Sequence, residues 1–357
     1  MFWEVSAAGH YDALERINKF LLSIFKFAFA SGSRKFDAAF FVASFQPDEV
    51  KFFLDRYHRK NSPLKEAIDP LFELCSMRRK AIYEALCHDK TFAHNRTLPF
   101  SFQTPHLPED ERQVLEDIFL YFFKNVFDGS GFRLSALPKG IFGCEEFEQG
   151  YFGTHTSKVL RNTCPICLQS VTNAPKEHDR EHFFPKSSYP ALTLHPINLY
   201  YSCNGCNTRY KKTKDPIAPL HNNVQTTFIP YVDIVREKVH IDITCDDQVK
   251  LRPNDLSDPF IQEKINTLNY LFQLEERWSD LLGGYNEYFY DEFKDSALAD
   301  IDVMQDEMLQ RLQMMKRAQD RRPEEYVKCH YLEWLCASDL EAFHANLIQD
   351  DKNSLVV

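Results

Sequence analysis

The sequence predicts a mainly α-helical protein of the α+β class with a small cysteine-rich unit near its middle. Three observations predict this. Apolar residues recur at helical spacing in both outer parts of the chain. Between about residues 132 and 215, Gly, Pro, Asn and His become frequent and the apolar runs shorten. Two Cys-x-x-Cys pairs lie inside that stretch.

The chain divides into four expected regions. Residues 1–130 form a helical N-terminal region, and residues 131–220 form the core that contains the cysteine pairs. Residues 221–257 form a strand and loop extension, and residues 258–357 form a helical C-terminal region.

The amino-acid composition limits the classes to which this protein can belong. A hydrophobic share of 44% over 357 residues, with 31 Phe and 16 Tyr, excludes wholesale disorder and supplies a core. The net charge of −10 argues against a basic protein that simply coats nucleic acid. The charge is uneven, however, because residues 151–220 sum to +5 and residues 258–357 to −11. A basic island therefore sits beside acidic helices.

The N-terminal region is expected to be helical from about Tyr11 to Asn95, because apolar residues recur every three or four positions. Pro108 is expected to start a further helix that runs to about Val126. Asp128-Gly-Ser-Gly ends that helix.

The elements expected after residue 220 are predicted from the same kinds of sequence pattern. Val239–Ile243 alternates apolar and polar residues, which predicts a strand or hairpin. Asp258 and Pro259 are typical of a helix N-cap and a first helical position. Helices are also expected over 297–321 and 324–347, with Pro323 as the break between them.

The two cysteine pairs, Cys164-Pro-Ile-Cys167 and Cys203-Asn-Gly-Cys206, are separated by 35 residues. The N-terminus lacks the pattern of a secretory signal and the chain lacks an apolar stretch of membrane-spanning length, so a reduced, cytoplasmic protein without a membrane is expected. In that compartment paired Cys-x-x-Cys motifs indicate a structural Zn²⁺ site of four thiolates. There are two alternatives for these motifs. The cysteine spacing could be due to chance, or the cysteines could form a zinc ribbon that only stabilises the fold.

Polar residues between and after the cysteines indicate more than a zinc ribbon. They are Asp179, Glu181 with His182, Asn198, and Asn207 directly after the last cysteine. This arrangement resembles the HNH, or ββα-metal, endonuclease family, in the variant whose third position is Asn and which carries two Cys-x-x-Cys zinc knuckles. The resemblance implies a ββα-metal core with Glu181 and His182 on its first strand, Asn198 on its second strand and Asn207 on the helix.

The chemistry of these residues agrees with that family. His182 has an ordinary pKa near neutrality and can take a proton from water, while Asn198 would orient His182 or the strand pairing rather than touch the metal. Glu181 and Asn207 offer the hard oxygen ligands that Mg²⁺ or Mn²⁺ prefers. Asp179 lies two residues before Glu181, on the same side of a strand, and could share the metal ion.

Five basic side chains are expected near the phosphates of a nucleic acid. They are Lys186, Arg209, Lys211, Lys212 and Lys214. A lysine run of this kind, taken alone, is more typical of a solvated face.

A narrower similarity covers Glu181–Pro190 and His195–Leu199, which look like HNH proteins of prokaryotic antiphage systems, among them the PtuB component of Septu. It implies a metal-dependent endonuclease that serves antiviral defence beside an ABC-type ATPase or another defence protein. DNA is the expected substrate, and RNA is the alternative, since such a site reads the phosphate backbone more than the bases. The acidic C-terminal region would repel nucleic acid and suits docking to a protein. The alternative function is a zinc-stabilised nucleic-acid-binding or adaptor module without hydrolysis.

Overall fold

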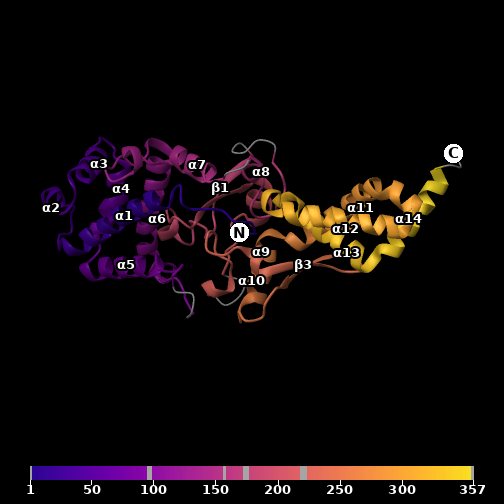
Figure 1. Cartoon of the computed structure of the whole chain (residues 1–357). Helices are drawn as coiled ribbons and strands as arrows, with labels where there is room; N and C mark the ends of the chain where they lie inside the picture. The colour runs from indigo at the N-terminus through magenta and orange to yellow at the C-terminus, as the bar shows by residue number, and fades with distance from the viewer. Residues whose placement is uncertain (1, 95–98, 156–157, 172–176, 218–222, 355–357) are drawn as a thin grey trace.

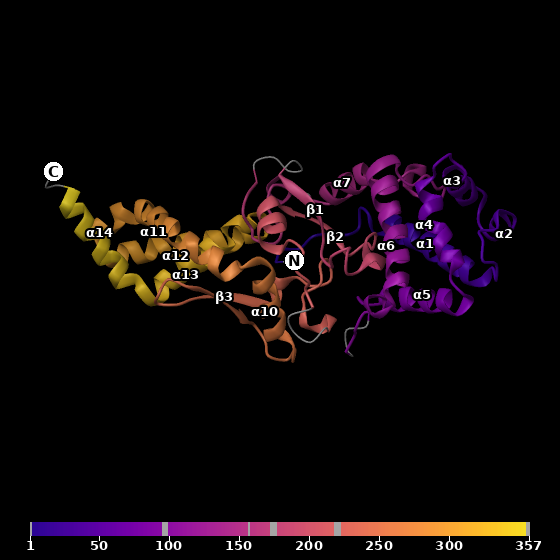
Figure 2. The same ribbon diagram turned by 180° about the vertical axis from the view of Figure 1, so that it is seen from behind.

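Helices gather at the two ends of an elongated molecule, and two small sheets lie between them (Figure 1). This computed structural model describes residues 2–94, 99–155, 158–171, 177–217 and 223–354. The N-terminal helices occupy one end and the long C-terminal helices the other, as the opposite view also shows (Figure 2). The predicted mainly helical α+β class is confirmed.

The N-terminal helices form around one apolar face of the first helix, where Leu14, Ile17, Leu21 and Ile24 are buried. The helix expected from Pro108 is present. It begins at Glu109 and continues beyond the expected end. The elements are α1 (Tyr11–Ala30), α2 (Ala38–Ser44), α3 (Pro47–Tyr57), α4 (Pro63–Glu73), α5 (Ser76–Asp89), η1 (Thr104–His106), α6 (Glu109–Tyr121), η2 (Phe122–Ser130), η3 (Pro138–Gly140) and α7 (Cys144–Gly153).

The middle of the chain contains two antiparallel hairpins, β1 with β2 and β3 with β4. The predicted strand over Val239–Ile243 is confirmed as β3. The elements here are α8 (Lys158–Arg161), β1 (His178–His182), η4 (Pro190–Leu192), β2 (Leu199–Cys203), η5 (Gly205–Lys211), η6 (Val224–Thr226), α9 (Val235–Lys238), β3 (Val239–Ile243) and β4 (Val249–Pro253).

The C-terminal helices depart from the expected boundaries. Asp258 does not cap a helix that starts at Pro259. Its carboxylate instead accepts the Phe260 N–H at 2.9 Å, and α10 begins at Ile261. The elements are α10 (Ile261–Phe272), α11 (Leu274–Ala299), α12 (Ile301–Ala318), η7 (Gln319–Arg321), η8 (Pro323–Glu325), α13 (Tyr326–Trp334), η9 (Leu335–Asp339) and α14 (Leu340–Ser354).

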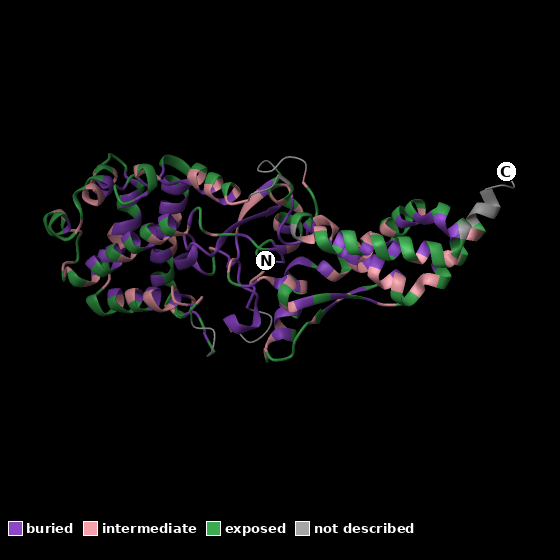
Figure 3. Ribbon diagram, viewed as in Figure 1, coloured by how far each residue is buried: buried purple, intermediate pink, exposed green. Residues whose placement is uncertain are grey.

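The first residues of the chain connect the parts of the fold. The Trp3 N–H donates to the Pro165 carbonyl at 3.0 Å, beside the first cysteine pair. The Phe2 ring packs edge-on against Trp278 of α11, with 4.9 Å between ring centres. Apolar side chains from all parts of the described chain form one buried cluster. Buried residues, purple in Figure 3, occur in the helices at both ends and are dense in the middle. No helix among the described residues has the length and apolar character needed to cross a membrane.

Two glycines meet where the turn before α1 crosses α7. A Cβ at Gly150 would lie 2.4 Å from the Gly9 carbonyl oxygen, and a Cβ at Gly9 would lie 2.1 Å from the Gly150 oxygen. We therefore expect Gly150→Ala to lower the free energy of unfolding by about 1–3 kcal/mol, measured by urea denaturation. Gly153→Ala is the matched control, because a Cβ there meets nothing within 4 Å. Equal stability of the two variants would contradict this close approach.

Candidate functional site

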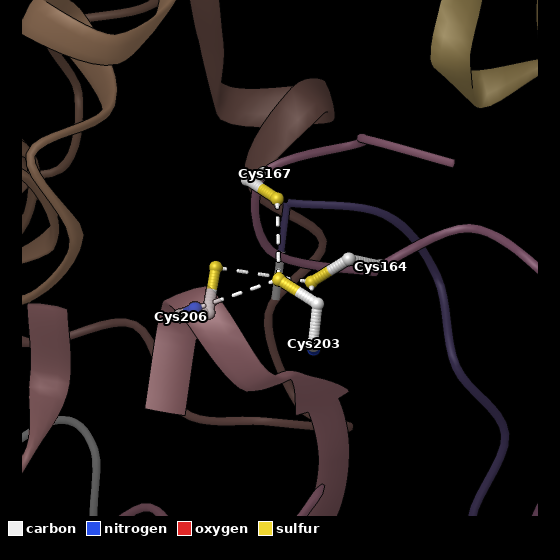
Figure 4. A group of neighbouring side chains, drawn as sticks. All are labelled: Cys164, Cys167, Cys203 and Cys206. Carbon is white, nitrogen blue, oxygen red and sulfur yellow. Dashed lines mark hydrogen bonds between the residues drawn. The ribbon is translucent and has the colours of Figure 1, made fainter. Parts of the chain in front are cut away.

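Four cysteine side chains meet in the interior of the middle region (Figure 4). Cys164 and Cys167 come from the turn that precedes β1. Cys203 ends β2, and Cys206 lies in η5. The sulfur atoms all lie within 4.8 Å of one another, and two of the pairs are 3.8 Å apart. Tetrahedral zinc with Zn–S bonds of about 2.3 Å would place its sulfurs about 3.8 Å apart. The predicted cluster of four thiols is confirmed, and it fits one zinc ion.

Two side chains of the C-terminal region donate hydrogen bonds to this cluster. The buried Arg277 donates from Nη1 to the Cys206 sulfur at 3.2 Å, and Trp278 donates its ring N–H to the Cys167 carbonyl at 3.0 Å. The Arg277 guanidinium also lies 4.2 Å from the centre of the Tyr210 ring. Burial alone would lower the pKa of Arg277, but the sulfurs of Cys206 and Cys167 outweigh it and raise this pKa. Arg277 therefore offsets part of the thiolate charge.

The hairpin β1–β2 presents the predicted acid and histidine on opposite faces. Glu181 pairs with Tyr200 across the hairpin, and successive side chains of a strand alternate between faces. Glu181 lies toward η5, where it contacts Lys211. His182 lies on the other side against Phe123 of η2, with 5.0 Å between the ring centres. The predicted placement of Glu181 and His182 on one strand is confirmed.

His182 is buried and its tautomer is set by one hydrogen bond. Its Nε2 lies 2.9 Å from the Thr193 carbonyl oxygen, which can only accept, so Nε2 carries the proton and Nδ1 the lone pair. Burial and, to a lesser extent, the charge of Lys186 lower the pKa of His182 to about 3. The imidazole is therefore neutral near pH 7 and holds a proton-accepting nitrogen.

Asn198 immediately precedes β2 rather than lying within it, and its side chain is completely buried. Its Oδ1 accepts the Phe184 N–H at 2.7 Å. Its Nδ2 donates to the carbonyls of Phe184 and Leu192, at 3.2 and 2.9 Å. These bonds fold back the loop that brings the Thr193 carbonyl to His182. Asn198 therefore contacts the loop backbone, as expected of a positioning residue.

Glu181 is paired with a lysine that the sequence placed on the surface. The Lys211 ammonium lies 2.7 Å from Oε1 of Glu181, and the Lys211 side chain is 0% exposed. Burial raises the pKa of Glu181, and Lys211 acts against that rise. Lys186 acts electrostatically on both Glu181 and His182, so these two side chains share one basic environment.

The predicted ligands of a catalytic Mg²⁺ or Mn²⁺ ion are not assembled in this conformation. Glu181 already contacts the Lys211 ammonium. Asp179 accepts a hydrogen bond of 2.9 Å from the Asn204 amide, and the partly exposed Asn207 lies in η5. Within the described part of the chain, the four cysteines are the one cluster of three or more His, Cys, Asp or Glu ligands. The catalytic ion therefore stays a prediction.

The predicted phosphate-binding side chains separate into two groups. Arg209 and Lys212 are exposed, and Lys186 is partly exposed with its ammonium 4.8 Å from the Phe123 ring centre. Lys214 is turned toward the C-terminal region, where its ammonium donates to the Tyr270 carbonyl at 2.7 Å. The prediction that Lys211 lies on this surface is wrong, because the ion pair with Glu181 buries it.

Two arginines at the site were not predicted from the sequence. Arg180 lies between Asp128 and Cys144 and contacts both of them, with its guanidinium about 5 Å from the ring centres of Phe123 and Phe127. Strand alternation could have placed Arg180 on the same face as His182. Arg277 reaches the cysteines from a separate region, and no local pattern indicates this contact.

Comparison of this chain with protein-family models, with curated proteins and with solved structures gave no significant match.

The cysteine geometry predicts about one tightly bound zinc ion per chain, measured by elemental analysis of the purified protein. Cys203→Ser should remove the metal and unfold the middle region, because metal binding and folding are coupled at such sites. Cys245→Ser is the matched control, since Cys245 is exposed and lies outside the cluster. A metal-free chain with undiminished thermal stability would contradict the zinc assignment.

Four buried histidines should make the folded chain less stable in mild acid. Burial lowers the pKa of His10 and His155 to about 4 and of His182 and His195 to about 3, from 6.5. Below pH 6.5 these imidazoles become protonated in the unfolded chain but stay neutral in the folded chain. The free energy of unfolding therefore falls as the pH is lowered. The urea midpoint should therefore be lower at pH 5.5 than at pH 7.5, with zinc content checked at both. An unchanged or higher midpoint would contradict the neutral buried state.

Proposed function

We propose that this chain is a metal-dependent HNH-type endonuclease that hydrolyses phosphodiester bonds of nucleic acid. The observation that carries the proposal is the buried, neutral His182 on β1, held by the Thr193 carbonyl. The order of elements also supports it, because β1, β2 and the helical segment η5 follow one another and carry His182, Asn198 and Asn207 in or beside them. That order is the one implied by the resemblance to ββα-metal nucleases.

The chain's own residues supply several parts of such a reaction. Nδ1 of His182 can accept the proton of the attacking water. Exposed Arg209 and Lys212, with Lys186 beside Phe123, can bind phosphate oxygens and hold the backbone in place. Asn198 keeps the supporting loop in position. A Mg²⁺ or Mn²⁺ ion would supply charge for the transition state.

The substrate and setting proposed here rest on the sequence resemblance. We infer DNA as the preferred substrate, with RNA as the alternative, and a cytoplasmic role in antiphage defence. The C-terminal helices are acidic and expose apolar side chains such as Met314. Such a surface suits a protein partner better than nucleic acid, and an ABC-type ATPase is the partner implied by the resemblance.

A second function is favoured by two specific observations. Glu181 is already paired with Lys211, and a histidine with a pKa of about 3 is a weak base. Both features suit a zinc-stabilised nucleic-acid-binding or adaptor module that does not cleave its ligand.

A cleavage assay separates these two functions. We expect purified protein to cut supercoiled plasmid with Mg²⁺ or Mn²⁺, and His182→Ala to lower the rate by about 10²–10⁴-fold through loss of the general base. His240→Ala is the matched control, because His240 is exposed on β3 and bonds only to Asn254 among the described side chains. Circular dichroism checks that both variants are folded.

Equal cleavage by wild type and folded His182→Ala would overturn the nuclease assignment. Tight binding of DNA or RNA without cleavage, in the presence of either metal ion and of the candidate ATPase, would favour the binding module. Matched DNA and RNA substrates decide between the two nucleic acids.

A further inference from the structure

The end of η5 holds a positive charge against the carboxylate that a catalytic metal ion would use. Lys211 is fully buried, and its ammonium lies 2.7 Å from the Glu181 carboxylate, which is 15% exposed. A divalent ion bound to Glu181 would meet that ammonium at short range, where like charges repel strongly. The two cations therefore compete for one carboxylate.

The backbone that carries Lys211 has an unusual conformation. The Lys212 N–H donates to the Asn207 carbonyl at 2.7 Å, five residues back, so η5 closes with a π-type turn. Lys212 has φ 50° and ψ −125°, a combination that favours glycine at the first central position of a type II′ turn. A lysine there is strained, and such strain persists only where surrounding contacts hold it. The Glu181–Lys211 pair is one of those contacts.

A further polar group beside Glu181 lacks a partner. Tyr200 lies directly opposite Glu181 in the hairpin and is fully buried. Its hydroxyl forms no hydrogen bond with any described residue. Buried hydroxyls are nearly always hydrogen-bonded, so the Tyr200 hydroxyl still has a hydrogen bond to give. The residue opposite Glu181 thus carries a polar group that no described side chain satisfies.

We propose that Lys211 is the resident cation of the Glu181 site and controls whether a divalent metal ion can bind there. In the structure as it stands, the ammonium neutralises the carboxylate. Relaxation of the strained turn at Lys212 would carry Lys211 away and free Glu181 for the ion. Arg209 and Lys212 are exposed on this same segment, so a bound phosphate backbone can favour the relaxed turn. This inference rests on the proposed function, whose catalytic ion it explains.

The test measures Mn²⁺ binding to the zinc-loaded full chain by electron paramagnetic resonance of the free ion. Removing the competing charge in Lys211→Met should tighten Mn²⁺ binding on the order of ten-fold or more relative to wild type. Lys211→Gln, which keeps a hydrogen-bond donor for Glu181, should tighten it less and serves if Lys211→Met fails to fold. The gain should vanish when Glu181→Gln is added to either variant.

Lys212→Gly tests the strained turn separately. Glycine adopts φ 50° without strain, so this variant should favour the paired state, raise the melting temperature and weaken Mn²⁺ binding. Unchanged Mn²⁺ affinity in the folded Lys211 variants, or a gain that survives Glu181→Gln, would overturn the proposal. These measurements need no cleavage, so a chain that binds Mn²⁺ as expected but never cuts nucleic acid would refute the nuclease function alone.

Discussion

Much of this structure depends on the convergence of four buried sulfur atoms. The cluster joins the turn at Cys164 and Cys167 to the end of β2 and the start of η5. It thereby holds the helical segment against the hairpin, because both carry ligands of the same site. A zinc ion held by the four sulfurs would tie these three segments together, because metal binding and folding are coupled at such sites.

The contacts of the cluster also explain why the flanking regions are not independent of the middle. Arg277 and Trp278 come from the first turns of α11 and bond to groups of the cysteine motif. The N-terminal segment reaches the same motif through the Trp3 N–H and packs Phe2 on Trp278. The N-terminal segment and the C-terminal helices therefore both contact the proposed zinc site. Loss of the metal ion would disturb the contacts of both regions.

Burial gives the two faces of the hairpin different chemistry. On one face His182 is neutral, because the interior disfavours its charged form and the Thr193 carbonyl holds one tautomer. On the other face Glu181 keeps its charge through the ion pair with Lys211. Glu181 and His182, adjacent in sequence, thus contact different groups, the Lys211 ammonium on one face and the Thr193 carbonyl on the other.

The sequence by itself determined the helical class and the grouping of the four cysteines, because helical periodicity and Cys-x-x-Cys spacing are local patterns. The strand that carries Glu181 and His182 and the helical position of Asn207 are implied by the family resemblance rather than by spacing, and both elements are present. Only the tertiary structure decided that Lys211 is buried against Glu181 and that Arg277 reaches Cys206. The first depends on a π-type turn and a strained Lys212, and the second on a contact across 71 residues. Neither contact produces a local sequence pattern, because the groups that stabilise each contact are distant from one another in the chain.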